Sequence, residues 1–140
     1  MVYDVVIIGA GVIGAAVARE LSRYEINVLV IEKEEDVCCG TSKANSAIVH
    51  AGYDCIPGSM MARMNVRGNE MMESLTQDLD IPFERTGSLL VCTQKDGLEG
   101  LQELYERGAK NGVKGMSILS HQKALEVEQS LSDNVLGALW

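Results

Sequence analysis

The feature that most constrains this 140-residue chain is a glycine pattern directly after its first apolar run. Residues 4–8, DVVII, have the length and β-branched composition of a short buried strand. Glycines then occupy the first, third and sixth places of a G-x-G-x-x-G turn, and an apolar helical run covers residues 12–21. A strand, a glycine turn and a helix in this order predict the start of a βαβ unit.

Each of the three glycines has a different predicted task. Gly9 permits the tight turn, Gly11 lets a pyrophosphate approach the backbone, and Gly14 allows the helix to pack closely on the strand. The start of the helix would present N–H groups and a positive dipole end to the phosphates. An ordinary glycine-rich turn is the alternative, so the nucleotide interpretation depends on the next strand.

An acidic residue at the end of that strand supports the nucleotide interpretation. Residues 27–31, NVLVI, form a second β-branched run, and Glu32 follows them near the expected spacing of ~20 residues. A carboxylate at this place hydrogen-bonds a ribose hydroxyl, and an acidic side chain argues against a 2′-phosphate. The pattern predicts an adenine dinucleotide, either FAD or NAD.

Composition excludes several classes of function. The net charge of −8 disfavours nucleic acid or an anionic membrane as the main partner. The longest apolar run, residues 5–18, is interrupted by glycines and is too short to span a bilayer. No basic segment precedes it, so a secretion signal is not predicted. We therefore expect a cytoplasmic protein without a membrane span.

The cysteines and histidines do not predict a metal site. Cys38 and Cys39 are adjacent, Cys55 and Cys92 stand alone, and no C-x-x-C pair is present. Free thiols in a reducing compartment are expected. His121 lies at a polar helix start and is predicted to be a surface residue.

The rest of the chain departs from a simple alternation of strands and helices. It predicts a helix at about 60–79, a hairpin of 83–85 with 89–93, helices at about 96–110 and 121–129, and a strand at 135–140. Ser59 is expected to cap the first of these helices, whose methionines would fill a core. Asp96 and Glu99 resemble a capping box. The hairpin predicts a second, antiparallel region.

The expected fold is therefore α/β, with a Rossmann-like dinucleotide-binding βαβ unit and the start of an antiparallel substrate region. We expect residues 1–80 to belong to the cofactor-binding domain and residues 81–140 to begin the substrate or cap region. Part of its sheet would lack partners, so oligomers or aggregation are possible outcomes.

Residues 40–54 form a second group of candidate functional residues. Small and hydroxyl-bearing side chains dominate the first part, where Thr41 or Ser42 is expected to cap a short helix to about residue 49. Such a segment suits a flavin pocket, although most Ser- and Asn-rich segments are ordinary loops. His50 lies in an apolar stretch, where histidines are usually structural. A neutral imidazole is nevertheless suited to take a hydroxyl proton near neutral pH.

Several of these segments together resemble the FAD-dependent oxidoreductases of the D-amino-acid oxidase superfamily, which are GR2-type flavoproteins. Within it, the chain is most similar to FAD-dependent glycerol-3-phosphate dehydrogenases and oxidases, followed by L-2-hydroxyglutarate oxidases. The similarity covers essentially the whole chain and is sharpest over residues 4–54. Members of this family run to several hundred residues, so the resemblance implies that the chain is the N-terminal piece of a longer protein. The matching segments are residues 4–14, 32–33, 40–54, 57–59, 65–69 and 85–89.

The resemblance implies FAD as the cofactor and His50 as the catalytic base beside the flavin. It places the adenosine ribose at Glu32. This chain has Ala47 at a position where members of the family often have glycine. The implied cofactor-binding residues are Gly9, Gly11, Val12, Ile13, Gly14, Glu32, Lys33, Thr41, Ser42, Asn45 and Ser46.

The resulting hypothesis is an FAD-dependent enzyme that oxidises the secondary hydroxyl of glycerol 3-phosphate, with hydride passing to flavin N5. L-2-hydroxyglutarate is the alternative substrate of the same chemistry. An NAD-dependent dehydrogenase and a non-catalytic fragment are the alternatives of other classes. Oxygen or another acceptor would reoxidise the reduced flavin. The isolated 140 residues are expected to bind FAD weakly or not at all.

Overall fold

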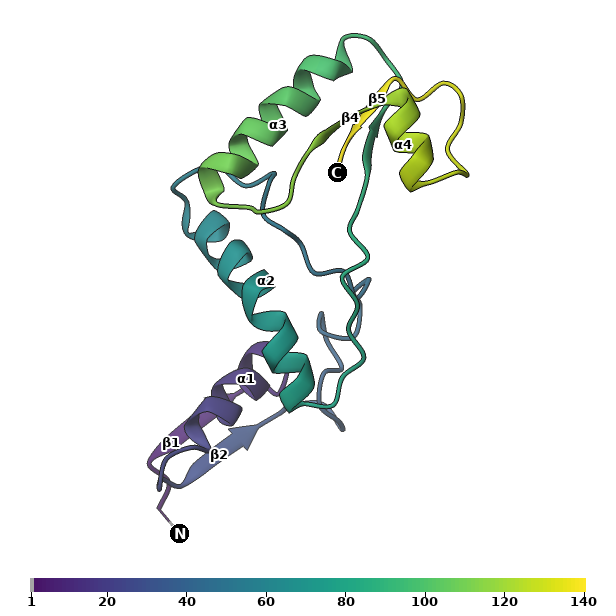
Figure 1. The fold of residues 1–140 in the computed structure, drawn as a ribbon. Helices are drawn as coiled ribbons and strands as arrows, with labels where there is room; N and C mark the ends of the chain where they lie inside the picture. The colour runs from purple at the N-terminus through teal and green to yellow at the C-terminus, as the bar shows by residue number, and fades with distance from the viewer. Residues whose placement is uncertain (1) are drawn as a thin grey trace. The chain divides into compact units, whose positions relative to one another are not determined.

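The computed structural model describes residues 2–140, which form two compact units (Figure 1). The first unit ends at Ile48, and the second is Val49–Trp140. Each unit has its own secondary structure, and each is described by itself. The domain boundary expected near residue 80 stays a prediction.

The first unit is the predicted βαβ arrangement. Strand β1 is Val5–Ile8, helix α1 is Val12–Leu21, and strand β2 is Val28–Ile31. The two strands pair in parallel, with Val5 opposite Val28, and α1 lies alongside them in Figure 1. The boundaries differ from the prediction only by one residue at the start of each strand, because the glycine turn and the apolar periodicity are local signals.

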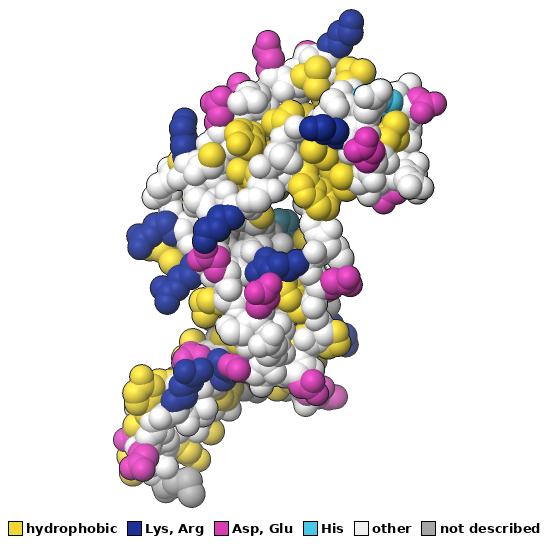
Figure 2. Space-filling model, viewed as in Figure 1, with side chains coloured by type: hydrophobic (Ala, Val, Ile, Leu, Met, Phe, Trp, Pro, Cys, Tyr) yellow, Lys and Arg dark blue, Asp and Glu magenta, His cyan; other side chains and the backbone are white. Residues whose placement is uncertain are grey.

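One face of this two-stranded sheet is uncovered. Val5 and Ile7 are half-buried, whereas Val6 and Ile8 alternate with them and are exposed, Ile8 at 89%. Strands of parallel sheets are usually covered on both faces. The first unit accordingly presents apolar side chains at its surface (Figure 2), in agreement with the expectation that part of the sheet lacks partners.

The second unit contains the expected antiparallel region. Its elements are helix α2 (Met60–Asp78), strand β3 (Leu90–Cys92), helix α3 (Gly97–Asn111), strand β4 (Ile118–Ser120), helix α4 (His121–Val127) and strand β5 (Gly137–Leu139). The sheet order is β3-β5-β4, with both outer strands antiparallel to β5. The three residues of β5 are buried. Leu101 of α3 clusters with Cys92 and Leu139, whereas Ala124 of α4 clusters with Ala138, so the two helices cover opposite faces.

The helix ends test the capping predictions. Ser59 caps α2 as predicted, because its Oγ accepts a hydrogen bond from the Ala62 N–H at 3.1 Å. Gly112 has φ +85° and ends α3 in the left-handed conformation. The capping box of Asp96 with Glu99 is wrong: Asp96 itself has helical dihedral angles, and its side chain makes no cap hydrogen bond.

The predicted hairpin of residues 83–85 with 89–93 is also wrong. Residues 81–89 contain neither helix nor strand, and β3 pairs with β5 near the end of the chain. Gly87 has φ +73°, and a Cβ there would lie 2.3 Å from the Trp140 ring. Gly87 therefore packs against a distant aromatic side chain instead of closing a local hairpin.

Two predictions of side-chain burial are wrong as well. The methionines of α2 do not fill a core, since Met60 is 63% exposed and the buried side chains of this helix are those of Ala62 and Thr76. His121 is half-buried rather than a surface residue, and its Nδ1 lies 2.6 Å from the Val135 carbonyl oxygen. Both differences depend on packing between segments far apart in the sequence.

Candidate dinucleotide-binding site

The glycine turn joins β1 to α1 and brings their backbones into close contact. Gly9 has φ +97°, in the left-handed region that favours glycine, and its N–H donates to the Ile31 carbonyl at 2.7 Å. Gly14 has no room for a side chain, because a Cβ there would lie 1.9 Å from the Gly9 carbonyl oxygen. The close packing predicted from the glycine spacing is therefore present.

The start of α1 combines a distant cap with unpaired donors. The Val12 N–H donates to Ser42 Oγ at 2.9 Å, across 30 residues of sequence. A Cβ on Gly11 would lie 3.0 Å from the same oxygen, so any residue other than glycine at this position would require the Ser42 side chain to shift. Among the described residues, the N–H groups of Ile13 and Gly14 have no hydrogen-bond partner. Together with the helix dipole, these donors form a site suited to an anion.

Glu32 connects the glycine turn to the end of β2. Its Oε2 accepts a hydrogen bond from the Ala10 N–H at 2.7 Å, and its Oε1 accepts from the N–H groups of Lys33 at 2.8 Å and Glu34 at 3.1 Å. These backbone hydrogen bonds, that of Ala10 first, hold the pKa of the Glu32 carboxyl below its ordinary value. A carboxylate has about four acceptor positions, so Oε2 retains one for a ligand hydroxyl.

We expect the first unit to lose stability in acid because of Glu32. Since the folded-state pKa is below the ordinary 4.5 of the unfolded chain, the stabilisation is fully present above 4.5. It is lost as the pH falls through the lower folded value. Thermal melts between about pH 6 and about pH 3 should therefore depend less on pH in the Glu32→Gln variant than in the wild type.

The neighbouring Glu34 offers a matched control for that experiment. Its side chain pairs with the Lys33 ammonium at 3.1 Å and accepts no hydrogen bond from the glycine turn. The Glu34→Gln variant should keep the acid dependence of the wild type. Equal pH dependence in the wild type and the Glu32→Gln variant would contradict the prediction.

The small-residue segment after Cys39 forms consecutive turns, so the short helix predicted from Thr41 or Ser42 is wrong. Two backbone hydrogen bonds of 3.1 Å close turns across residues 40–44. The Asn45 Nδ2 donates to the Ser42 carbonyl at 2.6 Å, and its Oδ1 accepts from the Ala47 N–H at 2.8 Å. Side chains that bond the nearby backbone compete with helix formation.

Two residues of this segment have left-handed backbone angles. Ala47, where members of the resembled family often have glycine, has φ +55°, a conformation that costs about 1–2 kcal/mol for a residue with a Cβ. Cys38 has φ +60°, and its N–H donates to the Ala10 carbonyl at 3.1 Å. The segment is therefore tied to the glycine turn through Cys38 as well as Ser42. No sequence pattern marked Ala10 or Cys38.

The other predicted loop residues lie at the surface of the first unit. Thr41, Asn45 and Ser46 are exposed, and the Lys33 side chain forms its ion pair with Glu34. Of the predicted residues on this loop, Ser42 is the one whose side chain accepts a hydrogen bond from the start of α1. The structure thus brings the glycines, Glu32 and Ser42 into one site, with Thr41, Asn45 and Ser46 on the same loop.

His50 lies in the second unit, in a stretch without helix or strand. The residue is exposed, and its backbone carbonyl accepts a hydrogen bond from the Asn69 Nδ2 at 3.2 Å. Its side chain is accessible, and α2 holds its backbone.

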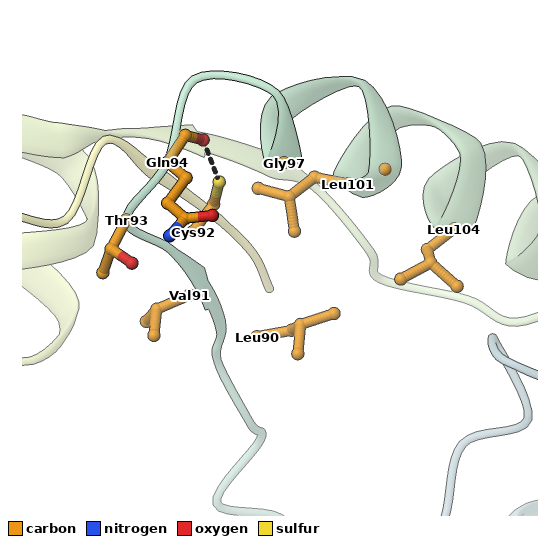
Figure 3. A pocket seen from close by; sticks show the side chains of 9 residues that line it. Leu90, Val91, Cys92, Thr93, Gln94, Gly97, Leu101 and Leu104 are labelled. Atoms are coloured by element: carbon orange, nitrogen blue, oxygen red, sulfur yellow. Dashed lines mark hydrogen bonds between the residues drawn. The ribbon is translucent and has the colours of Figure 1, made fainter.

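Two hollows in the second unit contain none of the predicted site residues. The first, of about 310 Å³, lies between β3 and α3 and includes Leu90, Leu101 and Cys92 (Figure 3). Its lining carries no charged side chain, and the Cys92 thiol donates to the Gln94 carbonyl at 2.9 Å. The second, of about 590 Å³, includes Arg85, whose guanidinium is engaged by neighbouring residues. The first hollow therefore lacks charged groups, and the Arg85 cation at the second is already paired with Glu73.

Within residues 2–140, no cluster of histidine, cysteine, aspartate and glutamate side chains is placed to hold a metal ion. The helices described over the same residues are too short or too polar to cross a membrane.

Comparison with protein families and with curated proteins gives consistent similarities. Residues 4–140 match the family model described as "DAO: FAD dependent oxidoreductase". The chain is 51% identical over 138 residues to glycerol 3-phosphate dehydrogenase of Caloramator mitchellensis, covering 99% of this chain and 29% of that protein. It is 34% identical over 130 residues to mitochondrial L-2-hydroxyglutarate dehydrogenase of Dictyostelium discoideum, covering 91% of this chain and 29% of that protein.

The solved structures include a similar flavoprotein. Dithionite-reduced L-α-glycerophosphate oxidase from Mycoplasma pneumoniae, with FAD bound, has a TM-score of 0.88 and 31% sequence identity. The match covers 98% of this chain and 36% of that chain. This chain therefore spans about a third of the length of the proteins it matches.

Proposed function

The chain belongs to the DAO family of FAD-dependent oxidoreductases, and we propose that the full-length enzyme oxidises the secondary hydroxyl of glycerol 3-phosphate. The observation that carries this proposal is the 51% identity to a glycerol 3-phosphate dehydrogenase, which extends over nearly the whole chain. The geometry of the first unit supports it, because the residues present there suit the cofactor.

The hydrogen-bond donors and acceptors at the glycine turn fit FAD. The unpaired N–H groups of Ile13 and Gly14 at the start of α1 would donate to the oxygens of a pyrophosphate. The remaining acceptor position on Glu32 Oε2 would take one ribose hydroxyl. We assign Thr41, Ser42, Asn45 and Ser46, as the family resemblance implies, to positions along the pyrophosphate, the ribityl chain or the isoalloxazine. When bound, FAD supplies the hydride acceptor of the reaction.

His50 is assigned the role of catalytic base. The secondary hydroxyl must lose its proton as the carbon loses hydride, and a neutral imidazole is suited to accept that proton near neutral pH. His50 is exposed, so its imidazole is accessible to a small molecule. His50 would hold the hydroxyl proton, and bound FAD would supply the acceptor for the hydride.

L-2-hydroxyglutarate is the second candidate substrate. The 34% identity to an L-2-hydroxyglutarate dehydrogenase over 91% of this chain favours it. Both candidates are small anions with a secondary hydroxyl, so one base and one cofactor serve either reaction. The lower identity is the reason for placing this substrate second.

A substrate comparison on the purified full-length enzyme tests the proposal. The protein should be yellow, and under anaerobic conditions glycerol 3-phosphate should bleach its flavin at least about tenfold faster than L-2-hydroxyglutarate, a difference of about 1.4 kcal/mol in activation free energy. Faster bleaching by L-2-hydroxyglutarate would reverse the order of the two substrates. A colourless protein that binds NADH tightly would overturn the assignment of FAD.

A further inference from the structure

The backbone of His50 is held by an asparagine of α2 that is itself held by an arginine. Asn69 Nδ2 donates to the His50 carbonyl at 3.2 Å. Arg85 donates to Asn69 twice, from Nη1 to the Oδ1 at 2.9 Å and from Nη2 to the main-chain carbonyl at 3.0 Å. The Arg85 Nε donates to Glu73 Oε1 at 2.6 Å. All four residues belong to the second unit.

This arrangement determines which way the Asn69 amide points. A guanidinium has donors and no acceptor, so the Asn69 atom that faces Arg85 must be the carbonyl oxygen. The NH₂ group then faces the other way, towards the His50 carbonyl, which can only accept. Glu73 and the Phe83 ring, whose centroid lies 5.5 Å from the guanidinium carbon, fix Arg85 in turn.

His50 depends on this contact because its segment lacks regular structure. Residues 49–51 belong to no helix or strand, so no ladder of backbone hydrogen bonds fixes their dihedral angles. The next anchor is Asn111, whose Nδ2 donates to the carbonyls of Gly52 at 2.9 Å and Cys55 at 2.8 Å. Asn69 is thus the anchor at His50 itself.

We propose that Asn69, oriented by Arg85, is a positioning residue that fixes the backbone of His50 and thereby the direction of its imidazole. The inference rests on the proposed role of His50 as the base. A base displaced by about 1 Å loses up to about 10²-fold in rate, so the side chain of Asn69 contributes to turnover without contact to the substrate. Arg85 contributes through Asn69.

The Asn69→Asp variant tests this assignment in the full-length, FAD-loaded enzyme. Aspartate keeps the size of the side chain and strengthens its pairing with Arg85, but it has no N–H to donate to the His50 carbonyl. The rate constant of flavin reduction should fall about 10- to 100-fold while the substrate dissociation constant changes less than about threefold. Hydrogen–deuterium exchange of a peptide covering residues 48–52 should become faster.

The same helix provides a matched control. Asn65 lies one turn before Asn69, and its Nδ2 donates to the Met61 carbonyl of its own helix at 3.2 Å. Asn65→Asp makes the same chemical change, so it should keep the rate and the exchange pattern of the wild type. Arg85→Lys should give an intermediate loss, because a single ammonium cannot replace the three guanidinium contacts.

The outcomes separate this inference from the proposed function. A slow His50→Ala variant beside an Asn69→Asp variant of wild-type rate would overturn the positioning role alone. A His50→Ala variant with the wild-type rate would overturn the proposed role of His50 as the base, and with it the premise of this inference. Equal losses in Asn69→Asp and Asn65→Asp would identify a general charge effect and would also overturn the positioning role.

Discussion

Replacing His50 with alanine is expected to slow reduction of the bound flavin by glycerol 3-phosphate about 10²- to 10⁴-fold, with FAD still bound. The loss follows from removing the group that takes the hydroxyl proton in the transition state. Flavin retention is expected because the groups assigned to the cofactor at the glycine turn belong to the first unit, whereas His50 belongs to the second. Anaerobic stopped-flow absorbance measures the reduction step, and the flavin content of the purified variant measures retention.

The other histidine of the chain is the control for this substitution. His121 contacts the Val135 carbonyl through Nδ1 at 2.6 Å. His121→Ala should lower the free energy of unfolding by about 0.5–1.5 kcal/mol, the net worth of one hydrogen bond, and should leave the reduction rate unchanged. A His50→Ala enzyme that reduces its flavin at the wild-type rate would exclude His50 as the base.

Replacing Gly14 with alanine is expected to disrupt the glycine turn and to weaken FAD binding. Alanine in a helix interior is favoured over glycine by about 0.5–1 kcal/mol. At Gly14 the added Cβ would lie 1.9 Å from the Gly9 carbonyl oxygen and 3.3 Å from Ile7 Cγ2. Relieving such contacts costs about 1–3 kcal/mol or more, so the clash outweighs the gain in helix propensity.

The dissociation constant of FAD should therefore rise at least about tenfold in the full-length Gly14→Ala enzyme, which corresponds to a loss of about 1.4 kcal/mol of binding free energy. The reason is that the displaced turn carries the donors assigned to the pyrophosphate. Fluorescence titration of the apoenzyme with FAD measures this change. Gly68→Ala is the control, because Gly68 lies inside α2 and a Cβ there would meet nothing within 4 Å. That variant should be more stable by about 0.5–1 kcal/mol. Unchanged FAD affinity in Gly14→Ala would contradict the prediction.

Much of the fold could be predicted from the sequence because its strongest signals are local. The apolar runs before and after the glycine turn predicted β1, α1 and β2 to within a residue. Ser59 marked the start of α2 because capping depends on a few neighbouring residues. Periodicity alone did not say whether the methionines of α2 would be covered, since burial depends on what packs against the helix.

The failed predictions share a dependence on distant partners or on competing local hydrogen bonds. The sequence predicted that the segment of β3 would pair with residues 83–85 in a hairpin. Its partner is β5, and Gly87 packs on Trp140. Thr41 and Ser42 predicted the start of a helix. The Asn45 side chain instead hydrogen-bonds the Ser42 carbonyl and the Ala47 N–H, which a helix would need for its own backbone hydrogen bonds. A window of ten residues around β3 contains neither its partner β5 nor Trp140.

The sequence by itself determined the βαβ unit, the family resemblance, and the identities of the glycines, Glu32 and His50 as candidates. Only the tertiary structure decided how those residues are held. Ser42 caps α1 across 30 residues, Glu32 shares its carboxylate with the Ala10 N–H across 22, and Asn69 reaches the His50 carbonyl across 19. The reason is physical: each polar group is satisfied by whichever partner folding brings within about 3 Å, and that partner is set by packing rather than by neighbouring residues.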